Sequence, residues 1–70
     1  METIYYSKEG NILIEVKRTE GATDIRAANR KGWMADIAPA MRLLYPPSVD
    51  LDEITPEAAA KLAVRLGVSL

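Results

Sequence analysis

Three turn-like stretches at equal spacing constrain the fold of this chain more than any other feature. The chain reads SKEGN, RTEGA and NRKGW in turn, and the glycines of these stretches, Gly10, Gly21 and Gly32, are eleven residues apart. Glycine adopts positive φ without steric penalty, which suits it to the tip of a β-hairpin. The spacing therefore predicts a four-stranded antiparallel meander. Its strands are expected at about 2–7, 11–19, 22–29 and 33–38.

The side chains of these segments predict a register with one apolar face. We expect a two-residue loop at 20–21 and three-residue loops at 8–10 and 30–32. The cross-strand partners would then include Tyr6 with Ile12, Ile14 with Ala27, Val16 with Ile25, and Asn29 with Trp33. The resulting apolar face comprises Ile4, Tyr6, Ile12, Ile14, Val16, Ile25, Ala27, Trp33, Ala35 and Ile37. A slip of one residue would divide this set between both faces, so the pattern specifies the register.

The charges on the other face support the same alignment. In this register Glu15 faces Arg26, Arg26 faces Asp36, and Lys17 faces Asp24. Opposite charges facing across strands stabilise a pair by about 0.2–1 kcal/mol. The alternative is a helix over 23–31, but it would be poor in apolar residues and would place like charges four residues apart. We therefore expect a strand there.

The second half of the chain has helical signals. A short helix is expected at 39–45, where Pro39 suits a first turn and Pro46–Pro47 end the helix, followed by a loop through SVDLDEI. A longer helix is expected from Thr55 as N-cap to Gly67 just past its end. Its apolar stripe consists of Ala59, Leu62, Ala63 and Leu66.

These elements predict an α+β fold in one domain, with a β-meander over 2–38 and a helical part over 39–67. The longer helix needs a surface to cover, and we expect it to pack on one face of the sheet, the apolar face being the natural choice. Side chains of 41–45 would cover the remainder.

The stretch ITPEAAAKLAVRLGVS at 54–69 resembles the first helix and turn of helix-turn-helix domains. In those domains a recognition helix follows and enters the DNA groove. Here the sequence stops at Leu70, so we expect a well-capped packing helix instead and assign no DNA-contacting residues.

The composition argues against catalysis and metal binding. The chain has no histidine and no cysteine, which removes the usual base near neutral pH and the commonest metal ligands. Nine basic and ten acidic residues give a formal net charge of −1, which is unusual for a dedicated binder of duplex DNA. We expect a non-enzymatic protein without a cofactor.

Two surfaces are candidates for binding a partner. The first is an apolar patch with a basic rim, for which the expected contact residues are Tyr5, Leu13, Met34, Arg30 and Lys31. In the alternative interpretation, the C-terminal helix or the segment 46–54 covers this patch as a second small core. The second surface is an acidic patch of Asp50, Asp52, Glu53 and Glu57, which could dock on a basic partner. Acids before a helix N-terminus also have a plain explanation, since the helix dipole favours them there.

The most economical function is a small protein-binding module that occupies a surface of a larger protein. Size and the absence of ligand-binding motifs are typical of phage or mobile-element accessory proteins and inhibitors, including anti-CRISPR-like ones. Nucleic-acid binding through the basic turn residues is the alternative. The free edge of the strand at 2–7 could also pair with a second copy as a homodimer. No run spans a membrane and no signal peptide is recognisable, so we expect a cytoplasmic protein.

Overall fold

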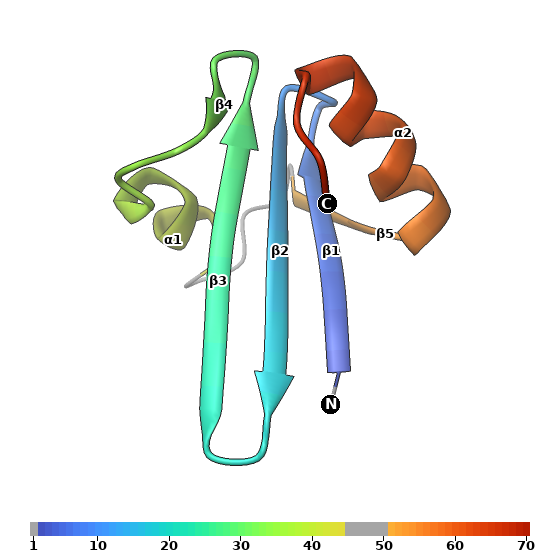
Figure 1. Cartoon of the computed structure of the whole chain (residues 1–70). Coiled ribbons are helices and arrows are strands. Elements are labelled where there is room, and N and C mark those ends of the chain that lie inside the picture. Colours follow the sequence, from blue (N-terminus) through green and yellow to red (C-terminus); the bar gives the residue numbers. More distant parts are fainter. Residues whose placement is uncertain (1, 45–50) are drawn as a thin grey trace.

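The three long expected strands are present, and they belong to a five-stranded antiparallel sheet with two helices packed on it (Figure 1). The computed structural model describes residues 2–44 and 51–70. The strands are β1 (Glu2–Lys8), β2 (Ile12–Thr19), β3 (Ala22–Asn29), β4 (Gly32–Trp33) and β5 (Leu51–Ile54), in the order β4-β3-β2-β1-β5, and the helices are α1 (Ala38–Leu44) and α2 (Pro56–Leu66). The α+β prediction is confirmed, and the helix considered for 23–31 is not formed.

The first two hairpins preserve the expected faces. Between β2 and β3 the register is as predicted, with Ile14 opposite Ala27. Between β1 and β2 the structure pairs Tyr6 with Ile14 rather than with Ile12. The turn begins one residue later than expected, because Glu9 and Gly10 both have positive φ, at 52° and 73°. A register shift of two residues leaves every side chain on its expected face.

The third hairpin differs by one residue, and the consequence is larger. Asn29 pairs with Gly32 and Ala28 with Trp33, so the loop has two residues rather than three. The side chain of Asn29 accepts a hydrogen bond of 2.8 Å from the Lys31 backbone N–H, which closes this tighter turn. A shift of one residue moves Trp33 to the opposite face of the sheet from the one predicted.

The strand expected at 33–38 is therefore wrong beyond Trp33, where β4 ends. The Asp36 carboxylate accepts a hydrogen bond of 3.0 Å from the Ala38 N–H at the start of α1. Asp36 thus serves the start of a helix rather than pairing with Arg26 across the sheet. Ala35 and Ile37 lie outside any strand.

The acidic segment before α2 is a strand and not the expected loop. β5 pairs antiparallel with β1 from Tyr5 to Lys8. The free edge predicted for the first strand is therefore occupied along this half of β1, which contradicts the homodimer route through that half. In Figure 1 this edge strand leads directly into α2.

Helix α2 follows its sequence signals closely. The Thr55 side chain accepts a hydrogen bond of 3.1 Å from the Ala58 N–H, Pro56 opens the helix, and Gly67 ends it at φ 77°. The four residues predicted for its apolar stripe are all buried, namely Ala59, Leu62, Ala63 and Leu66. The caps therefore set the two ends of the helix, as the sequence predicts.

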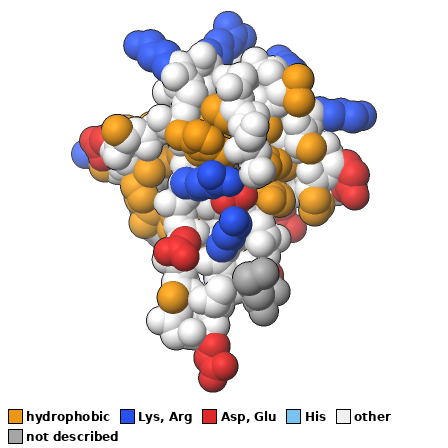
Figure 2. All heavy atoms as spheres, viewed as in Figure 1, with side chains coloured by type: hydrophobic (Ala, Val, Ile, Leu, Met, Phe, Trp, Pro, Cys, Tyr) orange, Lys and Arg blue, Asp and Glu red, His pale blue; other side chains and the backbone are white. Residues whose placement is uncertain are grey.

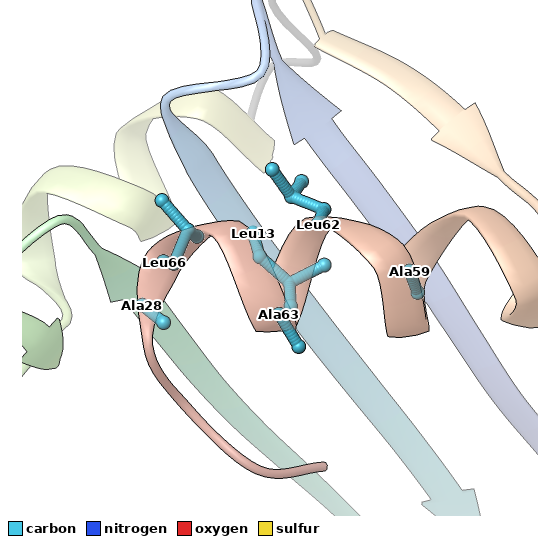
Figure 3. Close-up of a cluster of buried hydrophobic side chains, with 6 residues drawn as sticks. All are labelled: Leu13, Ala28, Ala59, Leu62, Ala63 and Leu66. Carbon is cyan, nitrogen blue, oxygen red and sulfur yellow. The ribbon is translucent and has the colours of Figure 1, made fainter.

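The sheet separates two small hydrophobic clusters. On one face α2 packs against β2 and β3, with Leu13 and Ala28 fully buried beneath it (Figure 3). On the other face α1 contributes Ala40 and Leu44 to a cluster that includes Ile14, Val16 and Ala27. The longer helix therefore covers the face opposite to the one that we expected it to cover. Neither helix of the described residues is long and apolar enough to cross a bilayer.

Candidate partner-binding surface

The predicted apolar contact patch is not a surface in the structure. Leu13 has no exposed area and lies under α2, with Tyr5 packed at the margin of the same cluster. Met34 packs with the cluster on the opposite face. The alternative interpretation, in which the C-terminal helix covers this region, is the one observed. The prediction failed because the shift in the third hairpin moved Met34 and because α2 chose this face.

The two basic residues of the predicted set remain exposed at the turn between β3 and β4. Arg30 donates a hydrogen bond of 3.4 Å from Nη2 to the Asn11 side chain, which joins this turn to the one between β1 and β2. A contact role for Arg30 and Lys31 stays a prediction, and it is now separate from Leu13 and Met34.

The predicted acidic patch is also divided. Asp50 lies outside the described residues. Asp52 and Glu53 are consecutive exposed residues of β5, and successive side chains of a strand point to opposite faces. Glu57 lies in the first turn of α2, where the helix dipole favours a carboxylate. The described acids therefore do not form one continuous surface.

A buried carboxylate organises the sheet face next to α2. The Glu15 side chain is only 3% exposed, and its Oε1 lies 2.6 Å from Nε of Arg26. Oε2 lies 3.4 Å from Nη2 of the same guanidinium. The predicted pairing of Glu15 with Arg26 is confirmed. Lys17 faces Asp24 as expected, but its ion pair, at 3.7 Å, is also with Glu15.

Two aromatic residues complete this cluster. The guanidinium of Arg26 stacks over the Trp33 ring, 3.9 Å from its centroid. The Tyr5 pKa is raised, first by burial and then by the negative charge of the neighbouring Glu15. Arg26 is thus held by a carboxylate on one side and an aromatic ring on the other, while 42% of its side chain stays exposed.

This cluster borders a hollow in the sheet face. A pocket of about 280 Å³ is lined by Glu15, Lys17, Asp24, Ile25 and Arg26. Figure 2 shows the basic and acidic side chains gathered there, on the part of the sheet that α2 leaves uncovered. Arginine, tryptophan and tyrosine are the types that dominate binding energy at protein interfaces. This hollow is a polar site whose arginine is already fixed in position.

The edge of β3 beside this hollow is open. Among the described residues, only Ala28 and Asn29 of β3 pair with β4. The Met34 N–H donates a bond of 2.8 Å to the Ala27 carbonyl, which shows that the backbone groups of Ala27 point outward from the sheet. Since this direction alternates along an antiparallel strand, the N–H and C=O of Ile25 and Thr23 point outward as well. They have no strand partner within residues 2–44 and 51–70.

The open edge and the hollow form one candidate surface, which we call the β3 edge site: residues 22–26 of β3 with Glu15 and Lys17 of β2. The sequence predicts that Arg26 pairs with Glu15 and Asp36 within the sheet and that a strand at 33–38 covers the edge of β3. The signal that could have shown otherwise is Asp36 two residues before Ala38, an arrangement that favours the start of a helix.

Comparisons with protein-family models, with curated proteins and with solved structures each find no match. Within the described ranges, the acidic side chains form no group of three that could hold a metal ion. The interpretation of the β3 edge site therefore rests on its own geometry.

Proposed function

We propose that this protein is a non-enzymatic protein-binding module that attaches to a larger protein by accepting one of its extended segments at the β3 edge site. The observation that carries this proposal is the outward backbone of Thr23 and Ile25, which has no strand partner in the part of the chain that the structure describes. An exposed edge strand is a ready template for a strand from another chain. β4 covers only the end of β3 from Ala28 to Asn29, so residues 22–26 have no strand partner on this outer side among the described residues.

The neighbouring side chains would give the added strand its specificity. Backbone hydrogen bonds supply affinity in strand addition, and pockets beside the edge select alternate side chains. Arg26 keeps exposed donors next to the hollow, and its partner groups prevent it from reorganising on binding. A carboxylate on the incoming strand would be the best match for those donors.

Removing one backbone donor tests the mechanism. Ile25→Pro deletes an outward N–H without deleting a bond to β2, and proline is tolerated on sheet edges of this kind. We expect Ile25→Pro to weaken partner binding by about tenfold or more, the equivalent of about 1.4 kcal/mol for the lost edge pairing. Ile25→Ala, which keeps the N–H, is the matched control and should bind far better than the proline variant.

The partner would first be captured from a lysate and identified, and binding would then be measured with purified components. Amide exchange gives a second readout that does not depend on any variant. The Ile25 and Thr23 amides should exchange quickly in the free protein and slowly in the complex. Equal affinity of Ile25→Pro and Ile25→Ala, with no new protection at these amides, would contradict strand addition.

The biological setting remains the one expected from the sequence, an accessory or inhibitor protein of a phage or mobile element, of the anti-CRISPR-like kind. An inhibitor that blocks a surface should lower the activity of its captured partner in proportion to complex formation. Measuring that activity with wild-type protein and with Ile25→Pro tests this setting, because only the first should inhibit.

Nucleic-acid binding is the second candidate, and the position of α2 favours it. The helix brings Lys61 and Arg65 to the end of the molecule where Arg30 and Lys31 lie, and Figure 2 shows basic side chains projecting there. A polyanion contacted by these cations would bind more weakly as salt rises. A gel shift at low salt that is lost in Arg30→Gln and Lys31→Gln would support this role, and the absence of a shift would reject it.

A further inference from the structure

A second pocket lies between α2, the first hairpin and β5. It is on the same sheet face as the β3 edge site, near the opposite edge of the sheet. It has a volume of about 270 Å³ and is lined by Ser7, Gly10, Ile54, Ala58, Lys61, Leu62 and Arg65. Its walls come from two stretches that are distant in sequence, 7–10 and 54–65, and α2 supplies four of the seven lining residues. The pocket is therefore a product of the folded chain rather than of one flexible loop.

The rim of this pocket is cationic. Lys61 and Arg65 are four residues apart on α2, so they project from the same helical face. The Arg65 guanidinium lies against the turn, since a Cβ added at Gly10 would stand 3.6 Å from its Nη1. Within residues 2–44 and 51–70, neither cation has a carboxylate within 4.0 Å, although Glu57 precedes Lys61 by one helical turn. As far as the described residues go, both charges are therefore available to an anion.

The floor of the pocket is apolar, with one hydroxyl. Leu62 is buried, and Ile54 and Ala58 complete the apolar part of the lining. Ser7 is 9% exposed, and its Oγ accepts a hydrogen bond of 3.2 Å from the Gly10 N–H. Because that oxygen is acting as an acceptor, the Ser7 O–H proton is left to donate to another group. A hydroxyl donor, two cations and an apolar lining suit a ligand that has an anionic hydrogen-bond acceptor and a hydrocarbon portion.

We propose that this pocket binds a small organic anion, a carboxylate, sulfonate or phosphate monoester with a short hydrocarbon body. The anionic head is held between Lys61 and Arg65 and accepts from Ser7, while the hydrocarbon body covers Ile54 and Leu62. The volume suits a ligand somewhat smaller than a typical drug molecule. This site is separate from the β3 edge site and does not depend on the proposed strand addition.

Three probes separate charge from apolar contact: hexanesulfonate, which has both, hexanol, which lacks the charge, and inorganic sulfate, which lacks the body. Each is titrated into the ¹⁵N-labelled protein while the amide resonances of Gly10, Ala58 and Leu62 are followed. We expect saturable shifts at these amides with hexanesulfonate. Hexanol should bind more weakly by about tenfold or more, because it lacks the charge-assisted contact. Sulfate should also bind more weakly by about tenfold or more, because it buries no hydrocarbon.

Two variants complete the test. Lys61→Gln with Arg65→Gln should weaken hexanesulfonate binding by about tenfold or more while leaving the rest of the spectrum unchanged, because both side chains are exposed. Arg42→Gln, on α1 at the opposite face of the sheet, is the matched control and should leave the affinity unchanged. The proposal is overturned if the shifts fail to saturate, if hexanol binds as tightly as hexanesulfonate, or if the double variant binds like wild type.

Discussion

Strands β1, β2 and β3 pair with one another along their length, but one end of this three-stranded unit is covered and the other is exposed. At the end near the first turn, Leu13, Ile14, Ala27 and Ala28 have no exposed area, because α2 covers one face and α1 contributes to the other. At the far end, 17–24 is exposed along both strands and the turn between them. One hairpin thus serves folding at one end and leaves its backbone edge open at the other. If the proposed function is right, the residues that stabilise the fold and those that bind the partner lie at opposite ends of the same strands.

The largest expected effect comes from a core residue at the covered end. Leu13→Ala removes a fully buried side chain beneath α2, and such truncations cost about 2–5 kcal/mol. At about 0.05–0.15 kcal/mol per residue, a chain of 70 residues has about 3.5–10 kcal/mol of total stability, so the loss should be plain in urea unfolding. Thr23→Ala at the open end is the control and should change the free energy of unfolding by about 0.5 kcal/mol or less.

This prediction also tests the division directly. If both substitutions cost the same, the far end would be as important for folding as the core, and an open edge reserved for a partner would lose its physical basis. A charged substitution at Leu13 cannot serve as a binding test, because burying an aspartate beneath α2 would unfold the protein rather than block an exposed patch.

The next effect concerns the boundary between the two regions, where Glu15 lies. Glu15→Gln keeps the shape but replaces a carboxylate that accepts from Arg26 and whose charge acts on Tyr5. We expect a loss of about 1–3 kcal/mol in chemical unfolding, since hydrogen bonds to charged groups are the stronger kind and their partners are left poorly satisfied. Asp24→Asn, which changes an exposed carboxylate that makes no ion pair within 4.0 Å among the described residues, should cost little. If Asp24→Asn lowered the free energy of unfolding more than Glu15→Gln, the carboxylate at the exposed end would be the more important one for stability.

The parts that the sequence predicted correctly share a local cause. The caps of α2 and its buried stripe follow from Thr55, Pro56 and Gly67, which act within one turn of their own positions. The register of β2 with β3 follows from a two-residue loop and from charge pairs that agree with it. In both cases neighbouring residues determine the geometry, so no knowledge of the rest of the fold is needed.

The errors arose where one local choice controls distant contacts. Whether the turn at Asn29 has two or three residues is a small energetic difference, yet it decides the face on which Trp33 lies. The choice of sheet face by α2 depends on both clusters at once, because each face offers an apolar surface. The β3 edge site could not be predicted for both reasons. It exists because β4 is short and because α2 leaves half of its sheet face uncovered.

A smaller effect is expected at the N-cap of α2, the helix that makes the covered end. Thr55→Ala removes the side-chain acceptor of the Ala58 N–H and should cost about 1 kcal/mol in urea unfolding. Thr55→Asn, which retains a capping oxygen, is the matched control and should recover most of that loss. If alanine is tolerated without cost, packing on Leu13 and Ala28 alone positions the helix.

The smallest effect is a pH dependence at the boundary. Because burial and the charge of Glu15 raise the Tyr5 pKa in the folded protein, the unfolded chain loses the phenol proton first as pH rises. The contribution of Tyr5 to stability should therefore be complete below about pH 10, the ordinary tyrosine value, and should decline above it. Tyr5→Phe should unfold with a shallower loss of stability between neutral and strongly alkaline pH than wild type. Tyr6→Phe, on the opposite face of the same strand, is the control, and an equal change in both variants would show that the alkaline loss does not come from the Glu15 cluster.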